Sequence, residues 1–295
     1  MSSFSSSICG SISTSFGVAE EATEPSESVG SFCSSLSSKF VPVVSISHTA
    51  ILPSTPKIQR IYLIRHGESQ ANVLGANGVR LIAGRQNEVE LTAKGVKQAT
   101  TLGEQLAKRV TKNASQQIVL CSSIAVRAKS TRQKIFEQME KHHNCILGDE
   151  YENLVEVSKG KYEGQPDGTQ KEDVKKWDAL PSAQKYTTAR LQTGESFKGV
   201  NARISLALQD IVKKHLGKTI FVVLHHDVIM SMSMIWCNHI SSLSPTKVVP
   251  FPPRVSLGNC DMLMLELTNG QNIEDGIPCA HIESEDNKHR EKRTC

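Results

Sequence analysis

The sequence predicts an α/β fold: a three-layer sandwich in which helices flank a central, mostly parallel sheet. Four short apolar runs have the composition of buried strands, at residues 60–64, 117–121, 220–224 and 261–267. Longer segments with helical spacing alternate with them, at residues 92–110, 124–139, 197–215 and 228–237. Because strands that alternate with helices form a sheet covered on both faces, this order predicts the three layers.

Local signals define where two of these helices begin. Thr92 is a favourable N-cap, and apolar residues follow it at helical spacing from Val96 to Leu106, so one face of this helix is expected to pack on the sheet. Asp227 stands before the last helical segment. We expect its side chain to cap a helix that begins at Val228.

Composition divides the chain into three parts. Residues 1–57 are rich in serine, and residues 270–295 are polar, so both are expected to be flexible because they cannot bury enough apolar surface to offset the entropy of ordering. Residues 58–269 then form one α/β domain. No basic residue precedes Lys39, which disfavours an organelle-import peptide, and no secretory pattern is present, so a cytoplasmic location is expected.

Charge and hydropathy argue against a membrane or nucleic-acid partner. Residues 219–237 are fairly apolar, but His225, His226 and Asp227 interrupt them well before the length needed to span a bilayer. The net charge is only +4, and the basic run at residues 288–293 is short. The positive balance is more consistent with attraction of a small anionic substrate.

The eight cysteines are expected to be reduced thiols, because no Cys-x-x-Cys pair and no secretory signal accompany them. They are Cys9, Cys33, Cys121, Cys145, Cys237, Cys260, Cys279 and Cys295. Cys279 and His281 lack a second pair of ligands at a suitable spacing. We therefore expect neither a metal nor another cofactor.

A candidate phosphate site follows the first predicted strand. Residues 61–64 run directly into Arg65-His66-Gly67-Glu68. In open α/β sheets, ligands bind beyond the carboxyl ends of the strands. There, Gly67 would let the backbone approach a ligand, Arg65 would clamp two phosphate oxygens, and His66 would be the nucleophile.

Further segments follow this motif in a definite order. They are Asn72, Gly84-Arg85, Leu91-Thr92-x-x-Gly95-x-x-Gln98-Ala99, Ser123-x-x-x-Arg127-Ala128-x-x-Thr131, Leu154-x-Glu156-x-x-x-Gly160, Gly194-Glu195-Ser196 and Val222-Val223-Leu224-His225. In this order they resemble the histidine phosphatase superfamily, also called the phosphoglycerate mutase-like family, in its branch with the Arg-His-Gly-Glu motif. The resemblance covers about residues 60–267 and implies that the domain at residues 58–269 is catalytic.

The resemblance implies that His66 carries the phosphoryl group, with Arg65, Arg127 and His225 around it. A phosphoryl group in transit spreads negative charge over three oxygens, so its site needs fixed positive charge. Guanidinium groups supply that charge and fork onto two oxygens each. His225 would add a donor if protonated, and a neighbouring anion would favour that state. These charges make a metal unnecessary.

Glu156 is the candidate general acid, again by resemblance. It would protonate the leaving oxygen and later take a proton from the hydrolytic water. Its segment is polar, and Glu150, Glu152 and Glu163 are rivals for this role. A carboxyl group among arginines also needs burial or a neighbouring anion to keep its proton.

The substrate-binding candidates are Asn72, Gly84 and His226, together with the two arginines. His226 departs from the family pattern, which usually has Ser-His-Gly at the second histidine, whereas this chain has Leu224-His225-His226-Asp227. His226 can offer its backbone N–H to phosphate only if its φ and ψ angles permit. Since successive strand side chains face opposite ways, the sequence leaves open which of the two histidine rings points inward.

We therefore predict a phosphomonoester phosphatase that works through a phosphohistidine on His66. A mutase and an inactive binding protein with the same fold remain alternatives. Mutases of this family have Trp-Tyr-Asp-Ala-Asp after the loop glycine, whereas residues 85–89 here read Arg-Gln-Asn-Glu-Val, which favours hydrolysis. Residues 151–189 have little apolar periodicity and are expected to form loops and short helices, such as residues 171–177, that select the substrate. The sequence names neither that substrate nor the oligomeric state.

Overall fold

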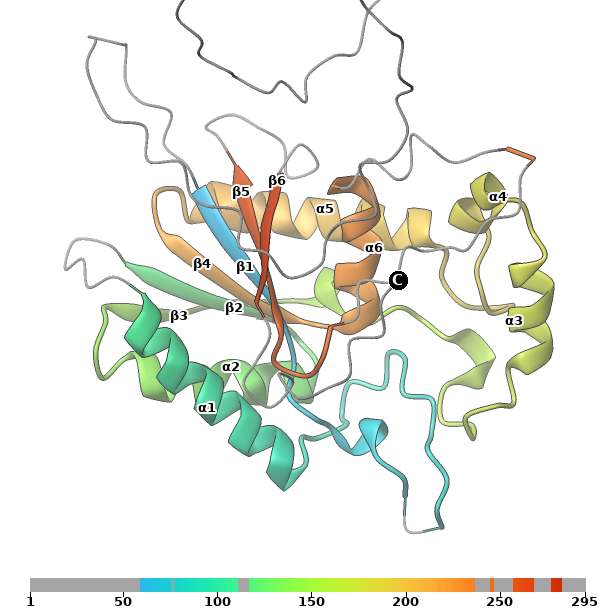
Figure 1. Ribbon diagram of the computed structural model, residues 1–295, viewed down its shortest axis with the longest axis horizontal. Helices are drawn as coiled ribbons and strands as arrows, with labels where there is room; N and C mark the ends of the chain where they lie inside the picture. Colours follow the sequence, from blue (N-terminus) through green and yellow to red (C-terminus); the bar gives the residue numbers. More distant parts are fainter. Residues whose placement is uncertain are drawn as a thin grey trace, which may run out of the picture. The chain divides into compact units, whose positions relative to one another are not determined.

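A six-stranded sheet forms the centre of the computed structural model, which describes residues 59–75, 77–110, 117–236, 245–246, 257–267 and 277–282 (Figure 1). The strand order is β3-β2-β4-β1-β5-β6 within this part of the chain. The strands are β1 (Gln59–Arg65), β2 (Ile118–Ser123), β3 (Cys145–Tyr151), β4 (Thr219–Leu224), β5 (Met262–Leu267) and β6 (Ile277–Ile282).

The sheet is mostly parallel, as the sequence predicts. β1 pairs with β4, β4 with β2, and β2 with β3, all in parallel. β5 runs antiparallel to β1, and β6 runs antiparallel to β5. β2 and β4 are buried along their whole length because they lie between other strands and have helices on both faces. Their continuous apolar runs are the local signal of that position.

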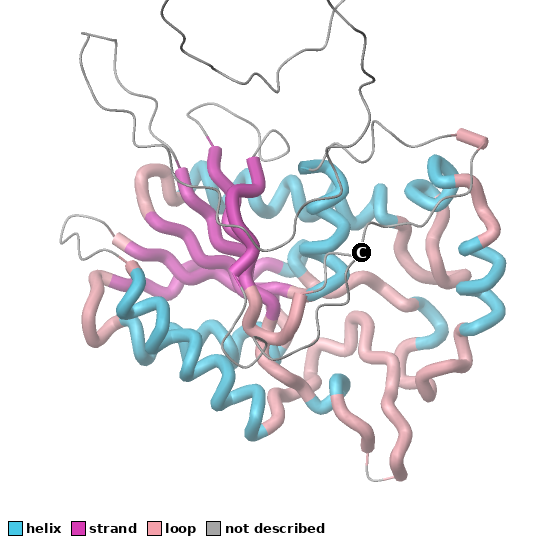
Figure 2. Tube along the Cα trace, viewed as in Figure 1, coloured by secondary structure: helices cyan, strands magenta, loops and turns pink. Residues whose placement is uncertain are grey.

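Helices cover both faces of the sheet, which confirms the three-layer sandwich (Figure 2). α1 (Ala93–Arg109) and α2 (Val126–Met139) pack on one face, against a core that includes Ile64, Leu120 and Phe221. α5 (Phe197–Lys214) and α6 (His226–Trp236) pack on the other, against a core that includes Ile61 and Val222. The short helices α3 (Lys171–Asp178) and α4 (Ser182–Thr187) lie beyond them, in the segment expected to hold loops and short helices.

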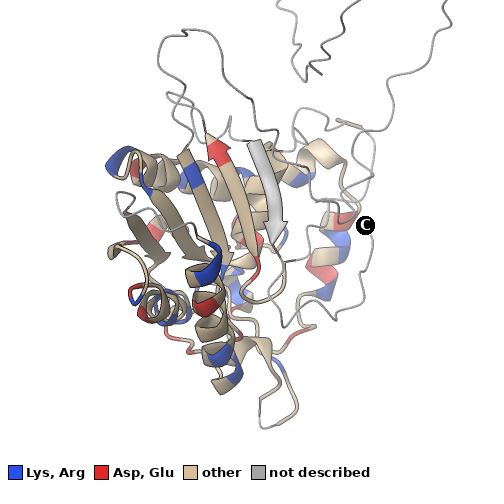
Figure 3. Cartoon of the chain, turned by 60° about the vertical axis from the view of Figure 1, so that its left-hand side comes forward, with Lys and Arg blue, Asp and Glu red and all other residues tan. Residues whose placement is uncertain are grey.

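Charged residues lie mainly on the helices and loops, and the strands contain few of them (Figure 3). An exception at the amino end of β1 is Arg60, which forms an exposed ion pair with Glu266 of β5 at 2.7 Å. The opposite, carboxyl ends of β1, β2 and β4 lie together because these strands are parallel. The amino end of antiparallel β5 joins them there.

Two strands depart from the sequence prediction. β3 is an edge strand whose residues are mostly half-buried or exposed, so it lacks the apolar run by which the inner strands are found. β6 lies within residues 270–295, the segment expected to be a flexible tail, and pairs with β5 at the other edge. Its sequence contains Pro278, which suits an edge strand but weakens a strand prediction.

The helix starts agree with the sequence at α1 and differ at α6. The Thr92 hydroxyl accepts a hydrogen bond from the Gly95 amide at 3.0 Å, which confirms the predicted N-cap. α6 begins at His226 rather than Val228, because the Ile229 amide already bonds the His225 carbonyl at 3.1 Å. The expectation that Asp227 caps this helix is therefore wrong.

The described residues contain no helix long and apolar enough to cross a membrane. The expected serine-rich extension at residues 1–57 lies outside the described residues, as does most of the segment after residue 269.

Candidate active site

His66 stands immediately after β1, and its backbone is fixed by the neighbouring strand. Its amide bonds the Leu224 carbonyl of β4 at 3.0 Å, and the side chain is only 5% exposed. Ring atom Nδ1 lies 2.7 Å from the Gly67 carbonyl oxygen. Since a carbonyl oxygen only accepts hydrogen bonds, Nδ1 must carry the proton, which leaves Nε2 with the lone pair of a nucleophile.

The segment after His66 packs against the first turn of α1 without room for side chains. A Cβ atom on Gly67 would lie 2.6 Å from the Gly95 carbonyl oxygen, and one on Gly95 would lie 1.9 Å from the Glu68 carbonyl oxygen. The Gly67 amide also donates to the Thr131 hydroxyl of α2 at 3.0 Å. Both glycines are therefore required by the close approach of two backbones.

His225 stands at the end of β4, beside β1, and faces His66. The two ring centroids are 5.2 Å apart, with the rings inclined at 64°. His225 is fully buried, and its Nε2 lies 3.0 Å from the Ser123 hydroxyl at the end of β2. Its Nδ1 is buried with no hydrogen-bond partner among the described residues.

The neighbouring ring of His226 has a partner outside this pair. Its Nδ1 lies 2.8 Å from an Asp227 carboxylate oxygen. The ring in contact with that of His66 is thus the ring of His225. His226 also lacks a positive φ angle, so its backbone adopts the ordinary helical conformation that any residue tolerates.

Backbone carbonyls anchor the two arginines. Arg127, in the first turn of α2, is 2% exposed and donates to the carbonyls of Gln86 at 2.7 Å and Gly84 at 3.2 Å. Arg65 donates to the Leu257 carbonyl at 2.5 Å. These bonds fix the position of each guanidinium group, which preorganises its charge for an anion.

Burial and these arginines determine the protonation of the histidine pair. Burial, and then the charges of Arg127 and Arg65, hold the pKa of His66 well below its ordinary value. Burial, Arg127 and His66 lower the pKa of His225 in the same way. Without an anion, both imidazoles are therefore neutral at neutral pH. A bound phosphate dianion would oppose the arginine charges and favour a protonated His225.

Glu156 follows the short helical turn η2 (Glu152–Leu154) and is half-buried. One of its carboxylate oxygens accepts from the Val157 amide at 2.9 Å. Burial, and then repulsion from Asp227, raise the pKa of Glu156, while Lys159 acts in the opposite direction. A raised pKa is what a general acid requires.

The rival acids have other partners or lie in solvent. Glu150 pairs with Arg132 at 2.6 Å, and Glu152 is exposed. Glu163 accepts from the Lys159 amide at 2.8 Å and from the Ser158 hydroxyl, so it shapes the loop that carries Glu156. These contacts favour Glu156 among the four candidates.

The two remaining substrate-binding candidates have structural partners. The side-chain oxygen of Asn72 accepts from the Ser69 amide at 3.0 Å, which leaves the Asn72 amide group as the part that would meet an anion. Gly84 contributes its carbonyl to Arg127 and has a φ angle of 49°. A side chain at position 84 would collide with Glu163.

One residue of the site, Asn259, was not predicted from the sequence. Asn259, 9% exposed, donates to the His66 carbonyl at 3.1 Å and to the Asn72 side-chain oxygen at 3.3 Å. It lies in the turn before β5, where the Cys260 amide also bonds the Arg65 carbonyl. The Gly258-Asn259 pair signals a turn, but only the antiparallel direction of β5 brings that turn to the end of β1.

Among the described residues, no three His, Cys, Asp or Glu side chains form a group that could hold a metal ion. The site instead presents a neutral imidazole nucleophile beside the buried guanidinium group of Arg127 and the half-buried one of Arg65, on a three-layer α/β sandwich. This combination defines an enzyme of phosphate-ester chemistry. Comparison with protein families matches residues 61–273 to the histidine phosphatase superfamily (branch 1), and the chain belongs to that superfamily.

Known relatives agree with this assignment. A metal-independent phosphoserine phosphatase of Arabidopsis thaliana is 32% identical over 180 residues, which cover 60% of this chain and 68% of the relative. A mycobacterial glucosyl-3-phosphoglycerate phosphatase has a similar structure, with a TM-score of 0.55, 19% identity and coverage of 77% of this chain and 99% of its own. A phosphoglycerate mutase of Bacillus anthracis has a TM-score of 0.53, 19% identity and coverage of 75% and 94%. At these identities, the two structures bear on the fold alone.

Proposed function

We propose that the protein hydrolyses phosphomonoesters through a phosphohistidine intermediate on His66. The observation that supports this most is the bond from Nδ1 to the Gly67 carbonyl, because it leaves Nε2 unprotonated in a site whose arginines also disfavour protonation. In the first step, Nε2 attacks phosphorus while the bond from phosphorus to the ester oxygen breaks. Glu156 gives that oxygen its proton, and the alcohol leaves.

The second step returns the enzyme to its starting state. Glu156, now a carboxylate, takes a proton from water as the water oxygen attacks phosphorus. The bond from phosphorus to Nε2 breaks, and inorganic phosphate is released. Arg65 and Arg127 stabilise the charge on the three equatorial oxygens in both steps, and His225 donates a further hydrogen bond once the anion has favoured its protonation.

We also propose a small phosphorylated metabolite as the substrate and the cytoplasm as the location. Phospho-L-serine is the first substrate to test, because the Arabidopsis relative carries that activity in its name. The described cysteines, Cys121, Cys145 and Cys260, are free thiols, as suits a reducing compartment.

The experiment measures phosphate release from p-nitrophenyl phosphate and phospho-L-serine. We expect His66→Ala to abolish it, and the exposed His142→Ala to leave it unchanged as a matched control. Quenching in alkali should preserve a phosphoryl group on His66 that acid then removes. Phosphate release that survives His66→Ala would disprove the covalent mechanism. Isomerisation of 3-phosphoglycerate without phosphate release would identify a mutase instead.

A further inference from the structure

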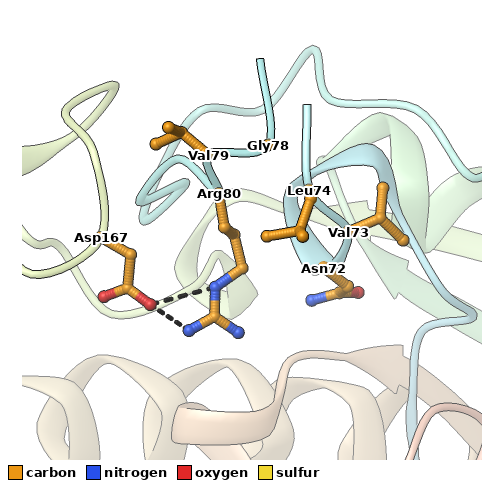
Figure 4. A pocket seen from close by; sticks show the side chains of 7 residues that line it. All are labelled: Asn72, Val73, Leu74, Gly78, Val79, Arg80 and Asp167. Carbon is orange, nitrogen blue, oxygen red and sulfur yellow. Dashed lines mark hydrogen bonds and ion pairs between the residues drawn. The ribbon is translucent and has the colours of Figure 1, made fainter. Parts of the chain in front are cut away.

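A surface pocket lies beside the candidate active site and is not used by the mechanism above. Its volume is about 600 Å³, and Figure 4 shows the residues around it. They are Asn72, Val73, Leu74, Gly78, Val79, Arg80 and Asp167. One part of the lining is aliphatic, and Leu74 is 66% exposed there. The other part carries the charged pair Arg80 and Asp167.

Backbone hydrogen bonds hold the two walls of this pocket together. The Asp167 amide bonds the Arg80 carbonyl at 2.8 Å, and Ile82 exchanges hydrogen bonds with Gln165 and Gly164 at 2.9 and 2.8 Å. Residues 80 and 82 are thus paired with residues 164–167, in the loop that follows the candidate acid. The pocket is therefore built by two fastened segments.

Asp167 orients the guanidinium group of Arg80. Two nitrogens of Arg80, Nε and Nη2, bond the same carboxylate oxygen of Asp167, and Gln170 holds the other oxygen at 2.9 Å. In Figure 4 the third nitrogen of Arg80 points away from Asp167, toward the side on which Asn72 lies. A half-exposed cation is thereby turned toward the Asn72 side of the pocket.

Asn72 connects this pocket to the reaction centre. Its side-chain oxygen accepts a hydrogen bond from Asn259, which also donates to the His66 carbonyl. Because Asn72 lines the pocket and its amide group is the part that would meet the phosphoryl group, an ester bound there has the pocket beside its alcohol.

We propose that this pocket binds the alcohol part of the substrate and selects an alcohol with an apolar body and a second anionic group. Leu74 and Val79 cover the apolar body, and Arg80 binds the anionic oxygens of a carboxylate or a second phosphate. The inference rests on the proposed phosphatase function. It assigns a specificity role to the residues that follow the Arg-His-Gly-Glu motif.

Three aryl phosphates that differ in one group test this subsite. Phenyl phosphate has no second charge, 4-carboxyphenyl phosphate adds a carboxylate, and 1,4-phenylene bisphosphate adds a phosphate. We expect Arg80→Gln to lower kcat/KM for the charged esters about five- to tenfold and to spare phenyl phosphate, since the cation is half-exposed and partly neutralised. Whichever charged ester shows the larger fall in kcat/KM carries the anionic group that the subsite prefers. Leu74→Ala should lower kcat/KM for all three esters relative to methyl phosphate.

The controls are matched in residue type and exposure. Arg60→Gln removes a half-exposed, ion-paired arginine at the opposite end of β1, and Leu206→Ala removes a leucine that is 70% exposed on α5. Equal effects of Arg80→Gln on all three aryl esters, or none, would overturn the subsite and leave the phosphatase intact. If no ester is hydrolysed, the proposed function fails. The three aryl esters are then compared by their calorimetric Kd values. Weaker binding of the charged esters alone in Arg80→Gln supports the subsite, and equal changes for all three, or none, overturn it.

Discussion

Replacement of Gly95 in α1 by alanine should displace the candidate nucleophile His66, although His66 does not lie in that helix. The added Cβ atom would lie 1.9 Å from the Glu68 carbonyl oxygen. That oxygen accepts from the Thr92 amide at 2.9 Å, and the Glu68 amide donates to the Gln98 side chain at 2.9 Å. Because hydrogen bonds hold both the amide and the carbonyl group of Glu68, the clash must move α1 or the backbone beside His66.

The size of the effect follows from two opposing contributions. Overpacking costs about 1–3 kcal/mol, and contact with backbone atoms places this site at the upper end. Alanine in a helix regains about 0.5–1 kcal/mol over glycine. The net loss of roughly 2 kcal/mol corresponds to a fall of about 4–8 °C in Tm for a domain of this size. Displacement of the nucleophile by a fraction of an ångström should also lower kcat about ten- to a hundredfold.

Gly199 supplies a matched control. It occupies the same position in α5 as Gly95 does in α1, with its amide bonded to the capping Ser196 hydroxyl at 3.2 Å. A Cβ atom there meets only ordinary contacts, the nearest at 3.5 Å. Gly199→Ala should therefore raise Tm by about 1–4 °C. Thermal melts and assays of phosphate release compare the stability and activity of the two variants. A Gly95→Ala protein as stable and active as its Gly199→Ala counterpart would refute the backbone-contact argument.

Three further predictions follow from the electrostatics of the site. Arg127→Lys keeps the charge but loses the fork that binds two loop carbonyls, so kcat/KM should fall about a hundredfold. His66 and His225 have folded pKa values below the unfolded value near 6.5, so the unfolded chain binds more protons under acid conditions. Urea melts should show stability that is complete above pH 6.5 and falls below it, by up to about 1.4 kcal/mol per pH unit for each histidine. Asp227→Asn should lower the pKa of Glu156 and move the alkaline limb of the pH dependence of kcat to lower pH.

Each of these predictions has a control and a contrary result. Arg109→Lys at the exposed end of α1 should change nothing, and equal losses at both arginines would contradict the role of the fork. His225→Gln should remove one proton from the acid dependence of stability, and an unchanged slope would show that other groups cause it. Asp178→Asn, at an exposed position, should leave the pH dependence of kcat unchanged. An unchanged pH dependence in Asp227→Asn would show that Asp227 does not raise the pKa of Glu156.

The inner strands could be predicted from sequence because burial on both faces requires an uninterrupted apolar run. β2 and β4 show such runs: β2 ends with Ser123, which contacts His225, and β4 is followed directly by His225. The same local reasoning missed β3, whose mixed burial reflects its place at the edge. An edge strand has no residue pattern that distinguishes it from a loop until its partner is known.

The histidine pair was likewise predictable, because both rings follow strands and parallel strands end on the same side. Asn259 was not. It lies 193 residues from His66 in the chain and reaches it only because β5 runs antiparallel beside β1. Strand direction is a property of the completed sheet, so the turn that supports Arg65, His66 and Asn72 could not be assigned from its own residues.

The replacement of the usual glycine by His226 is accommodated through side chains. His226 begins a helix with an ordinary backbone, and its ring bonds Asp227. Asp227 in turn pairs with Lys159 at 2.5 Å, three residues after the candidate acid. Although burial opposes it, Lys159 holds the pKa of Asp227 well below its ordinary value. Burial, and then the charge of Asp227, raise the pKa of Glu156, and the charge of Lys159 does not offset them fully. The departure from the family pattern thus links the second histidine to the acid on which both steps depend.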